Sequence, residues 1–420
     1  MKKYLALKMA SLMLGGFIGV GVLSGCSNSE KPELEYVDVS DLPNASKPEI
    51  PSFVFNETDG TETSGSTVND NISDNTEIEI STNGNQSNNT EIEISALSEY
   101  YSAVTNIAEF DSEKVKSVFF GNTDVINNTI NRPDRNPIYN WEYEEKKLTV
   151  INDNATIEYS SDPATFINII FGPPVQGHKG NAHLFEHRDD DLDFCTRYEA
   201  VKAVSDTLSE LGISVYNKAM VYSLCQNDMQ AVVDAECEKG EFYQFDDEWQ
   251  RIPVSSYNVQ KNQECYYIVF NADWNGVPIY NGELYYMTIK DLVIFQPKIT
   301  AIYSAEGIVE LKVEEYRSIS QGEKISQLIS PESAAQVVGE KYKDVVGIEK
   351  ISFDQMSLMY VLTPYSENGK IAPYKTNLTP AWVCAVEMTE YTYDRETGTQ
   401  APVTSQKYIF IDAQTGVEII

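Results

Sequence analysis

The residues of this chain with the clearest chemical potential are its three histidines, His178, His183 and His187, which lie in one short segment. His183 and His187 are four positions apart, a spacing that places both side chains on one face of a helix. Two imidazoles can hold a zinc ion while a neighbouring carboxylate, here Glu186, polarises a zinc-bound water. The spacing therefore raises the hypothesis of a hydrolytic zinc site.

The order of these residues resembles that of a known peptidase family. H-x-x-E-H, with the flanking GNAHLFEH, resembles the zinc box of the inverted, insulysin-like peptidases. In that family the third ligand is a glutamate about seventy-five residues downstream, and here 76 residues separate His187 from Glu264. The resemblance thus implies His183, His187 and Glu264 as zinc ligands.

The sequence around the motif argues against this hypothesis. Two glycines and an asparagine precede it, and three aspartates follow Arg188, where they would oppose the negative pole of a helix. Glu264 directly precedes a predicted strand, and 64 acidic residues in the chain make its spacing easy to obtain by chance. We therefore expect a solvated loop, no catalytic residue, and no metal or cofactor.

A calcium loop is a second interpretation of the same segment. Asp189, Asp191 and Asp193 alternate as calcium ligands do in an EF-hand. Phe194 stands where that loop needs glycine, however, and Ala200 where it needs a glutamate. A charged loop leading into a helix accounts for the aspartates equally well.

Other catalytic constellations are missing from the sequence. G-x-S-x-G does not occur, every histidine lies in the one cluster, and the carboxylates are too numerous for any pair to stand out. Five cysteines follow Cys26 without a C-x-x-C pair, so most should be buried thiols, although one disulfide remains an alternative. They are Cys195, Cys225, Cys237, Cys265 and Cys384.

The N-terminus indicates export and a lipid anchor. Three lysines precede an apolar run that ends at Leu23, which is typical of a secretory signal. Leu23-Ser24-Gly25-Cys26 resembles the lipobox of bacterial lipoproteins, which implies removal of residues 1–25 and acylation of Cys26. The resemblance predicts a protein attached by its lipid to the outer face of the cell membrane.

Charge and composition describe the segment that follows the anchor. The formal charge is −33, and losing residues 1–25 with their three lysines makes it −36, which excludes nucleic acid as a partner. Residues 26–97 are rich in Ser, Asn, Thr and acidic residues and are predicted to form a disordered tether. The repeated NTEIEIS at 75–81 and 89–95 could instead form a hairpin.

Ordered sequence is expected from residue 98. Asp111 begins a short helix, and Thr196-Arg-Tyr-Glu199 forms a capping box ahead of a helix that stops at Gly212. Ser330-Pro331 caps a second such helix. Each helix precedes a strand-like segment, which favours two related α+β units, although any two amphipathic helices ending in glycine can look alike. Further strands are expected at 141–150, 156–160, 166–171, 213–224, 265–271, 299–304, 308–316, 348–362, 381–393 and 406–411.

The C-terminal half carries a family resemblance. ISPESAAQVV, LTPAW at Leu378–Trp382 and the terminal YIFIDAQTGVEII are similar to PepSY-like and YycH/YycI-type extracytoplasmic regulators of Gram-positive bacteria. The whole chain resembles uncharacterised clostridial lipoproteins. The resemblance implies an α+β fold of antiparallel sheet with packed helices, in domains 98–262 and 263–420. It also implies a non-catalytic module that binds or regulates an envelope protein. A zinc peptidase and a solute- or cation-binding lipoprotein remain alternatives.

Overall fold

A computed structural model describes the greater part of the chain. The described residues are 36–38, 92–93, 100–161, 185–240, 242–245, 251–286, 292–320, 322–342, 348–393 and 400–419. Several features of the sequence lie outside them: the expected signal segment, Cys26, His178, His183 and the strand expected at 166–171. Within the described residues, no helix has both the length and the hydropathy of a membrane span.

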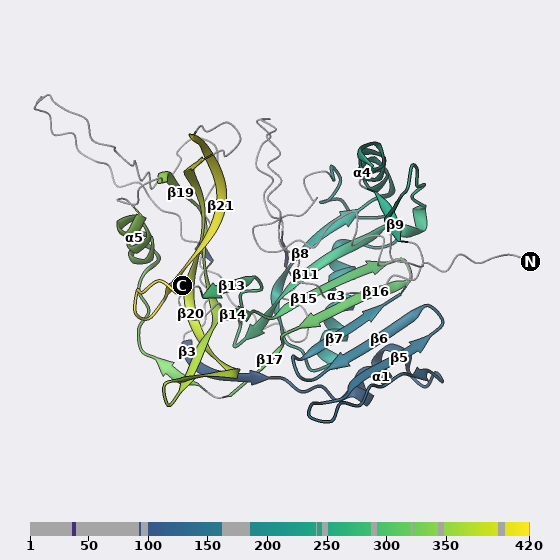
Figure 1. Ribbon diagram of the computed structural model, residues 1–420, viewed down its shortest axis with the longest axis horizontal. Helices are drawn as coiled ribbons and strands as arrows, with labels where there is room; N and C mark the ends of the chain where they lie inside the picture. Colours follow the sequence, from purple (N-terminus) through teal and green to yellow (C-terminus); the bar gives the residue numbers. More distant parts are fainter. Residues whose placement is uncertain are drawn as a thin grey trace, which may run out of the picture.

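Two sheets dominate the described chain (Figure 1). The larger has ten strands, and all of its neighbouring strands are antiparallel. Its order is β1 (Tyr36–Asp38), β8 (Val215–Leu224), β11 (Cys265–Trp274), β15 (Lys298–Ser304), β16 (Gly307–Glu314), β7 (Thr156–Ser160), β6 (Lys146–Ile151), β5 (Ile138–Tyr143) and β4 (Ile126–Asn127), with β12 (Val277–Pro278) paired to β11.

The second sheet has seven strands and is built round two long ones, β19 and β20. Its order is β17 (Arg317–Ile319), β3 (Tyr100–Ile107), β20 (Lys370–Tyr393), β19 (Ile348–Glu367) and β2 (Ile92–Glu93), with β18 (Glu323–Ile325) paired to β3 and β21 (Gln400–Asp412) paired to β20. Two small hairpins are separate: β9 (Tyr243–Phe245) with β10 (Arg251–Pro253), and β13 (Glu283–Tyr286) with β14 (Leu292–Phe295).

Helices cover parts of these sheets. The α-helices of the described residues are α1 (Ser112–Phe120), α3 (Arg197–Glu210), α4 (Gln226–Lys239) and α5 (Pro331–Tyr342), and η2 (Lys261–Gln263) is a short 3₁₀ turn. Because side chains alternate along a strand, successive residues of β8 pack on opposite faces of the large sheet. Val221 belongs to the cluster that includes α3, and Tyr222 to the cluster that includes α4. α5 lies on the side of the smaller sheet that faces away from the larger one (Figure 1).

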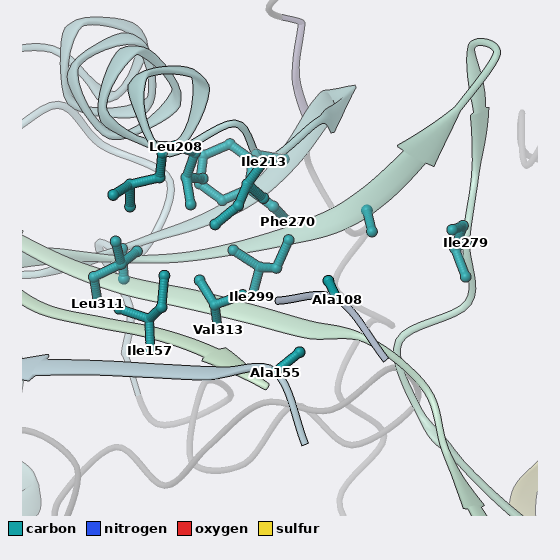
Figure 2. Packing of buried hydrophobic residues seen from close by; sticks show 14 of the residues in the cluster. Ala108, Ala155, Ile157, Leu208, Ile213, Phe270, Ile279, Ile299, Leu311 and Val313 are labelled. Atoms are coloured by element: carbon teal, nitrogen blue, oxygen red, sulfur yellow. The ribbon is translucent and has the colours of Figure 1, made fainter. Parts of the chain in front are cut away.

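The main core lies under α3. Leu208 of α3 is fully buried and faces Phe270, Ile299 and Leu311 on neighbouring strands of the large sheet (Figure 2). The same cluster continues into the smaller sheet through residues of β19 and β20, such as Tyr360 and Leu378. The two sheets therefore share one hydrophobic core.

The fold corrects the sequence expectation of an α+β architecture made of two units of sheet with packed helices. The described chain is mostly antiparallel β-sheet, and its few helices cover only parts of two large sheets. The expectation was wrong because local capping signals reveal helices but not how far strands extend. β19 and β20, at 20 and 24 residues, are much longer than ordinary strands.

Strands on the two sides of residue 262, where the sequence predicts a division, pair with each other. β8 lies before that position and β11 after it, yet they pair along most of their length. Two segments of the expected tether join sheet edges as well. β1 pairs with β8, and β2, inside the second copy of NTEIEIS, pairs in parallel with β19.

Candidate functional site

The histidine segment is a turn where the structure describes it. Residues 186–189 are in turn conformation, while the neighbouring Phe185 is fully buried and fixes the segment against the α4 side of the sheet. The His187 side chain is 53 % exposed. His183, the other histidine of the H-x-x-E-H motif, lies outside the described residues.

Glu264 does not face this turn as a free ligand. It is buried, its Oε1 accepts the backbone N–H of Gln226 at 2.9 Å, and its Oε2 is 2.7 Å from Nζ of Lys261. Both oxygens are therefore engaged, one by the first turn of α4 and one by a cation. The arrangement implied by the peptidase resemblance is not formed by His187 and Glu264.

The partner of His187 is Asp228, which sequence reasoning missed. Asp228 lies in the first turn of α4 and is buried. Its Oδ2 accepts the backbone N–H of His187 at 2.8 Å, and its Oδ1 is 3.0 Å from Nδ1 of the ring. The hydrogen bond to Asp228, followed by the charge of that carboxylate, raises the pKa of His187 above its ordinary value.

The three aspartates that alternate as in a calcium loop have protein partners. Oδ1 of Asp191 accepts the backbone N–H of Arg197 at 2.8 Å, and Oδ1 of Asp189 is 3.8 Å from Nη1 of Arg197. Asp193 pairs with Lys261 at 3.0 Å. These contacts support the interpretation of the segment as a charged loop ahead of α3.

A larger candidate site lies between the two sheets, and we call it the inter-sheet groove. Its open part has a volume of about 850 Å³ and its deeper part about 210 Å³. Ile107, Asp153, Asn154 and Tyr374 line both parts, so the two are continuous. The groove is formed by the end of β3, the segments before β5 and after β6, and the β19–β20 hairpin.

Arg317 provides the deeper part of the groove with unpaired donors. Arg317 is the first residue of β17 and pairs in register with Ile107 of β3. It lines the deeper part of the groove, and its side chain is only 6 % exposed. Nη2 lies 2.9 Å from Oε2 of Glu315, but in the described part of the chain no group accepts from Nε or Nη1. Burial lowers the pKa of Arg317, yet arginine stays charged in proteins.

An unpaired acceptor lies on the same wall. Oδ1 of Asn154 is buried and has no hydrogen-bond partner among the described residues. A buried donor or acceptor without a partner costs about 1–3 kcal/mol, so such groups are usually satisfied by water or a ligand. Arg317 and Asn154 together therefore give the deeper part of the groove two donors and one acceptor without partners among the described residues.

The rest of the groove is polar at its walls and aromatic at its rim. Arg132 bonds to Asp153 at 2.8 Å and fixes the loop before β5 against the end of β6. Tyr374 is 69 % exposed and Phe295 47 % exposed, and both line the groove. Exposed rings beside fixed polar groups suit a ligand that is partly apolar and partly hydrogen-bonded.

Charge sets the groove apart from the rest of the molecule. Four cationic and four acidic side chains line it, whereas the whole chain has 31 Lys and Arg against 64 Asp and Glu. The cations are Arg132, Arg135, Arg317 and Lys375, and the acids are Glu109, Asp134, Asp153 and Glu315. The groove is thus locally balanced on an otherwise strongly acidic protein.

Sequence reasoning did not find the groove, and little in the sequence marks it. Arg317 is one arginine in a short strand, and Asn154 is one of many asparagines. Asp228 had a weak signal, because Met229, Val232 and Val233 repeat at helical spacing before Gly240 and predict a helix beginning near Cys225.

Comparison with known proteins identifies a similar fold but assigns no function. No family model and no curated protein matches the chain. A crystal structure of an uncharacterized protein from Eubacterium rectale is similar, with a TM-score of 0.56 and 18% sequence identity. The similarity covers 77% of this chain and 86% of that one. At this identity the likeness concerns the fold alone.

Proposed function

We propose that this protein is a non-catalytic binding module, anchored through Cys26 outside the cell membrane, that acts on an envelope protein by holding a segment of it in the inter-sheet groove. The lipobox and the resemblance to extracytoplasmic regulators support the location and the class of partner. The single observation that carries the proposal is the buried Arg317, a residue of the groove whose Nε and Nη1 have no acceptor in the part of the protein that the structure describes.

The chemistry of the groove favours a peptide segment with an oxygen acceptor near an apolar side chain. Arginine binds carboxylates through two parallel N–H groups, and it donates singly to backbone carbonyls. Tyr374 and Phe295 offer apolar surface at the rim, and Asn154 offers an acceptor for a backbone N–H. A carboxylate-bearing segment of the partner satisfies all of these groups.

Site-specific photocrosslinking in cells tests the proposal. A photoreactive residue at position 374 should form an adduct with a membrane or envelope protein. The same residue at position 198 should not, because Tyr198 is also exposed but lies on α3, away from the groove. The adduct should become several-fold weaker when Arg317→Gln is combined with the label at 374.

Two results would contradict the proposal. Equal adducts from positions 374 and 198 would show that the groove is not the contact surface. Failure to recover any envelope protein from position 374, together with binding of a small solute by the purified chain, would favour the solute-binding alternative instead.

A further inference from the structure

A second cluster of chemically active side chains lies at the N-terminus of α4, on the other side of the large sheet from α3. A nitrogen of His187, the Sγ of Cys225 and a carboxylate oxygen of Asp228 all lie within 4.8 Å of one another. The three residues come from two segments far apart in the sequence, and the fold brings them together independently of the groove.

We propose that His187, Cys225 and Asp228 bind one zinc ion, with solvent at the fourth position. Imidazole nitrogen, thiolate sulfur and carboxylate oxygen are the three donor types that zinc takes in proteins. Ligands round a tetrahedral zinc lie about 3.3–3.7 Å apart, given metal–ligand distances of about 2.0–2.3 Å. A small rotation of the exposed His187 side chain can bring the three ligand atoms to these distances.

The local charges favour a cation. α4 presents its positive pole here, but the carboxylate of Asp228 lies in its first turn. The charge of Glu264, which accepts from Gln226 in the same turn, is offset by Lys261. The charges of Asp190 and Glu186 also act on His187. Arg188 is directed to the carbonyl of Phe185 and to Asp189. The negative charge of the carboxylates therefore exceeds the partial positive charge of the helix N-terminus, and the site attracts a divalent cation.

Metal binding changes the protonation of two ligands. Burial, partly offset by backbone hydrogen bonds, raises the pKa of Cys225, so its thiol is neutral in the metal-free protein. Zinc would bind the sulfur as thiolate while the thiol proton leaves to solvent, and it would bind His187 as neutral imidazole. No oxidation or reduction is involved.

The chain provides a matched control in Cys237. It is also on α4, near the other end of the helix, and packs against the same hydrophobic cluster. It is a free thiol like Cys225, but it is not part of the three-residue cluster. Cys237→Ser therefore removes a thiol from the same helix without touching the proposed ligands.

The test uses the purified full chain, stripped with a chelator and then titrated with Zn²⁺ or Co²⁺. We expect one zinc per chain and, with Co²⁺, a thiolate-to-metal charge-transfer band. Cys225→Ser should abolish the band and weaken zinc binding at least about tenfold, and Asp228→Asn should weaken it about 10–100-fold. Cys237→Ser should keep the wild-type band and affinity.

His187→Gln guards against a folding artefact, because the amide of Gln can donate to Asp228 in place of the half-exposed imidazole, so the metal-free thermal transition should shift little. This variant should lose zinc as Cys225→Ser does. Absence of stoichiometric zinc in the wild-type chain would overturn the proposal. Equal affinity of Cys225→Ser and wild type, or loss of the cobalt band in Cys237→Ser, would overturn it as well.

Discussion

Asp273, at the end of β11, shows how burial sets the protonation of a single carboxyl. Its Oδ2 accepts the backbone N–H of Gly276 at 3.2 Å and the hydroxyl of Ser214 at 3.5 Å. Its Oδ1 is buried and has no hydrogen-bond partner in the described ranges. Burial outweighs the two hydrogen bonds and raises the pKa of Asp273 to about 6.

This shift predicts a specific pH dependence of stability. In the unfolded chain an aspartate titrates near about 3.9, so between about pH 4 and pH 6 the folded state holds a proton that the unfolded state has lost. The contribution of Asp273 to the free energy of unfolding therefore falls as pH rises through this window and stays low above it. Asp273→Asn should stabilise the protein at pH 7.5 by about 1–3 kcal/mol and change little at pH 4.

Urea denaturation of both proteins at pH 4 and pH 7.5 measures this difference. Asp206→Asn is the control, because Asp206 is exposed on α3 and its pairing with Lys202 should be worth less than about 0.5 kcal/mol at either pH. If Asp273→Asn gives the same change in unfolding free energy at both pH values, the carboxyl is already ionised in the folded state at pH 4.

At the same scale, the candidate sites show what single residues reveal in a sequence. His187 attracted attention because histidine is rare in this chain, and the structure places it in a three-residue cluster. Of its neighbours there, Cys225 had no feature that distinguished it from the other cysteines, and Asp228 had only the weak signal of a helix predicted to begin near it. Glu264 was chosen by spacing, and spacing alone does not show that its oxygens bond to Gln226 and Lys261.

Among the elements, α3 was the one best predicted, because its signals are local. The side chain of Thr196 accepts the backbone N–H of Glu199, and the side chain of Glu199 accepts the backbone N–H of Thr196, as the sequence predicts. Ala200, Val204 and Leu208 form the buried stripe. Gly212, with φ of 80°, follows the last turn.

Thr196→Ala should therefore lower the free energy of unfolding by about 1 kcal/mol, because it leaves a donor of the first turn unsatisfied. Thr207→Ala, in the last turn of the same helix, should change it by less than about 0.5 kcal/mol. Chemical denaturation of the two variants gives the comparison. A larger loss for Thr207→Ala than for Thr196→Ala would show that the cap does not stabilise α3.

Strands were predicted in place but not in length or partner. The expected strand at 156–160 coincides with β7, and the terminal turn forms as expected, with Oδ1 of Asp412 accepting the N–H of Thr415. The segment expected as one strand over 141–150 is instead part of a hairpin, β5 and β6. Glu144, with φ of 53°, lies in the turn between them. The two adjacent glutamates of this turn are not typical turn residues, so the sequence does not indicate a turn between the two strands.

On the scale of the whole molecule, the two sheets are joined by specific polar contacts as well as by the shared core. Nε2 of Gln296 donates to the carbonyl of Leu362 at 3.0 Å, and Oε1 of Gln296 accepts the N–H of the same residue at 2.8 Å. Both residues are buried. Nearby, the N–H of Tyr280 bonds to the carbonyl of Tyr360, and the rings of Trp274 and Tyr360 lie 5.2 Å apart.

Gln296→Ala should cost about 2–5 kcal/mol of unfolding free energy, because it removes two buried hydrogen bonds, one to the N–H and one to the carbonyl of Leu362 in β19. Because both sheets share one core, we also expect the variant to unfold in a single transition at lower urea. Gln414→Ala is the control, since Gln414 is exposed in the terminal turn and should leave the transition unchanged. Two separate transitions, observed by fluorescence and circular dichroism, would contradict a single cooperative unit.

The sequence by itself determined those features that depend on residues close together in the chain: the helix caps at Asp111 and Thr196, the terminal turn, and the positions of many strands. Only the tertiary structure decided which strands pair, because antiparallel partners such as β8 and β11 are separated by intervening helix and loop and alternation alone does not select a partner. For the same reason, the sequence does not predict either candidate site: the residues of each site are far apart in the chain. Arg317 and Asn154 line one groove, and His187 lies near Cys225, only after two large sheets have brought distant segments together.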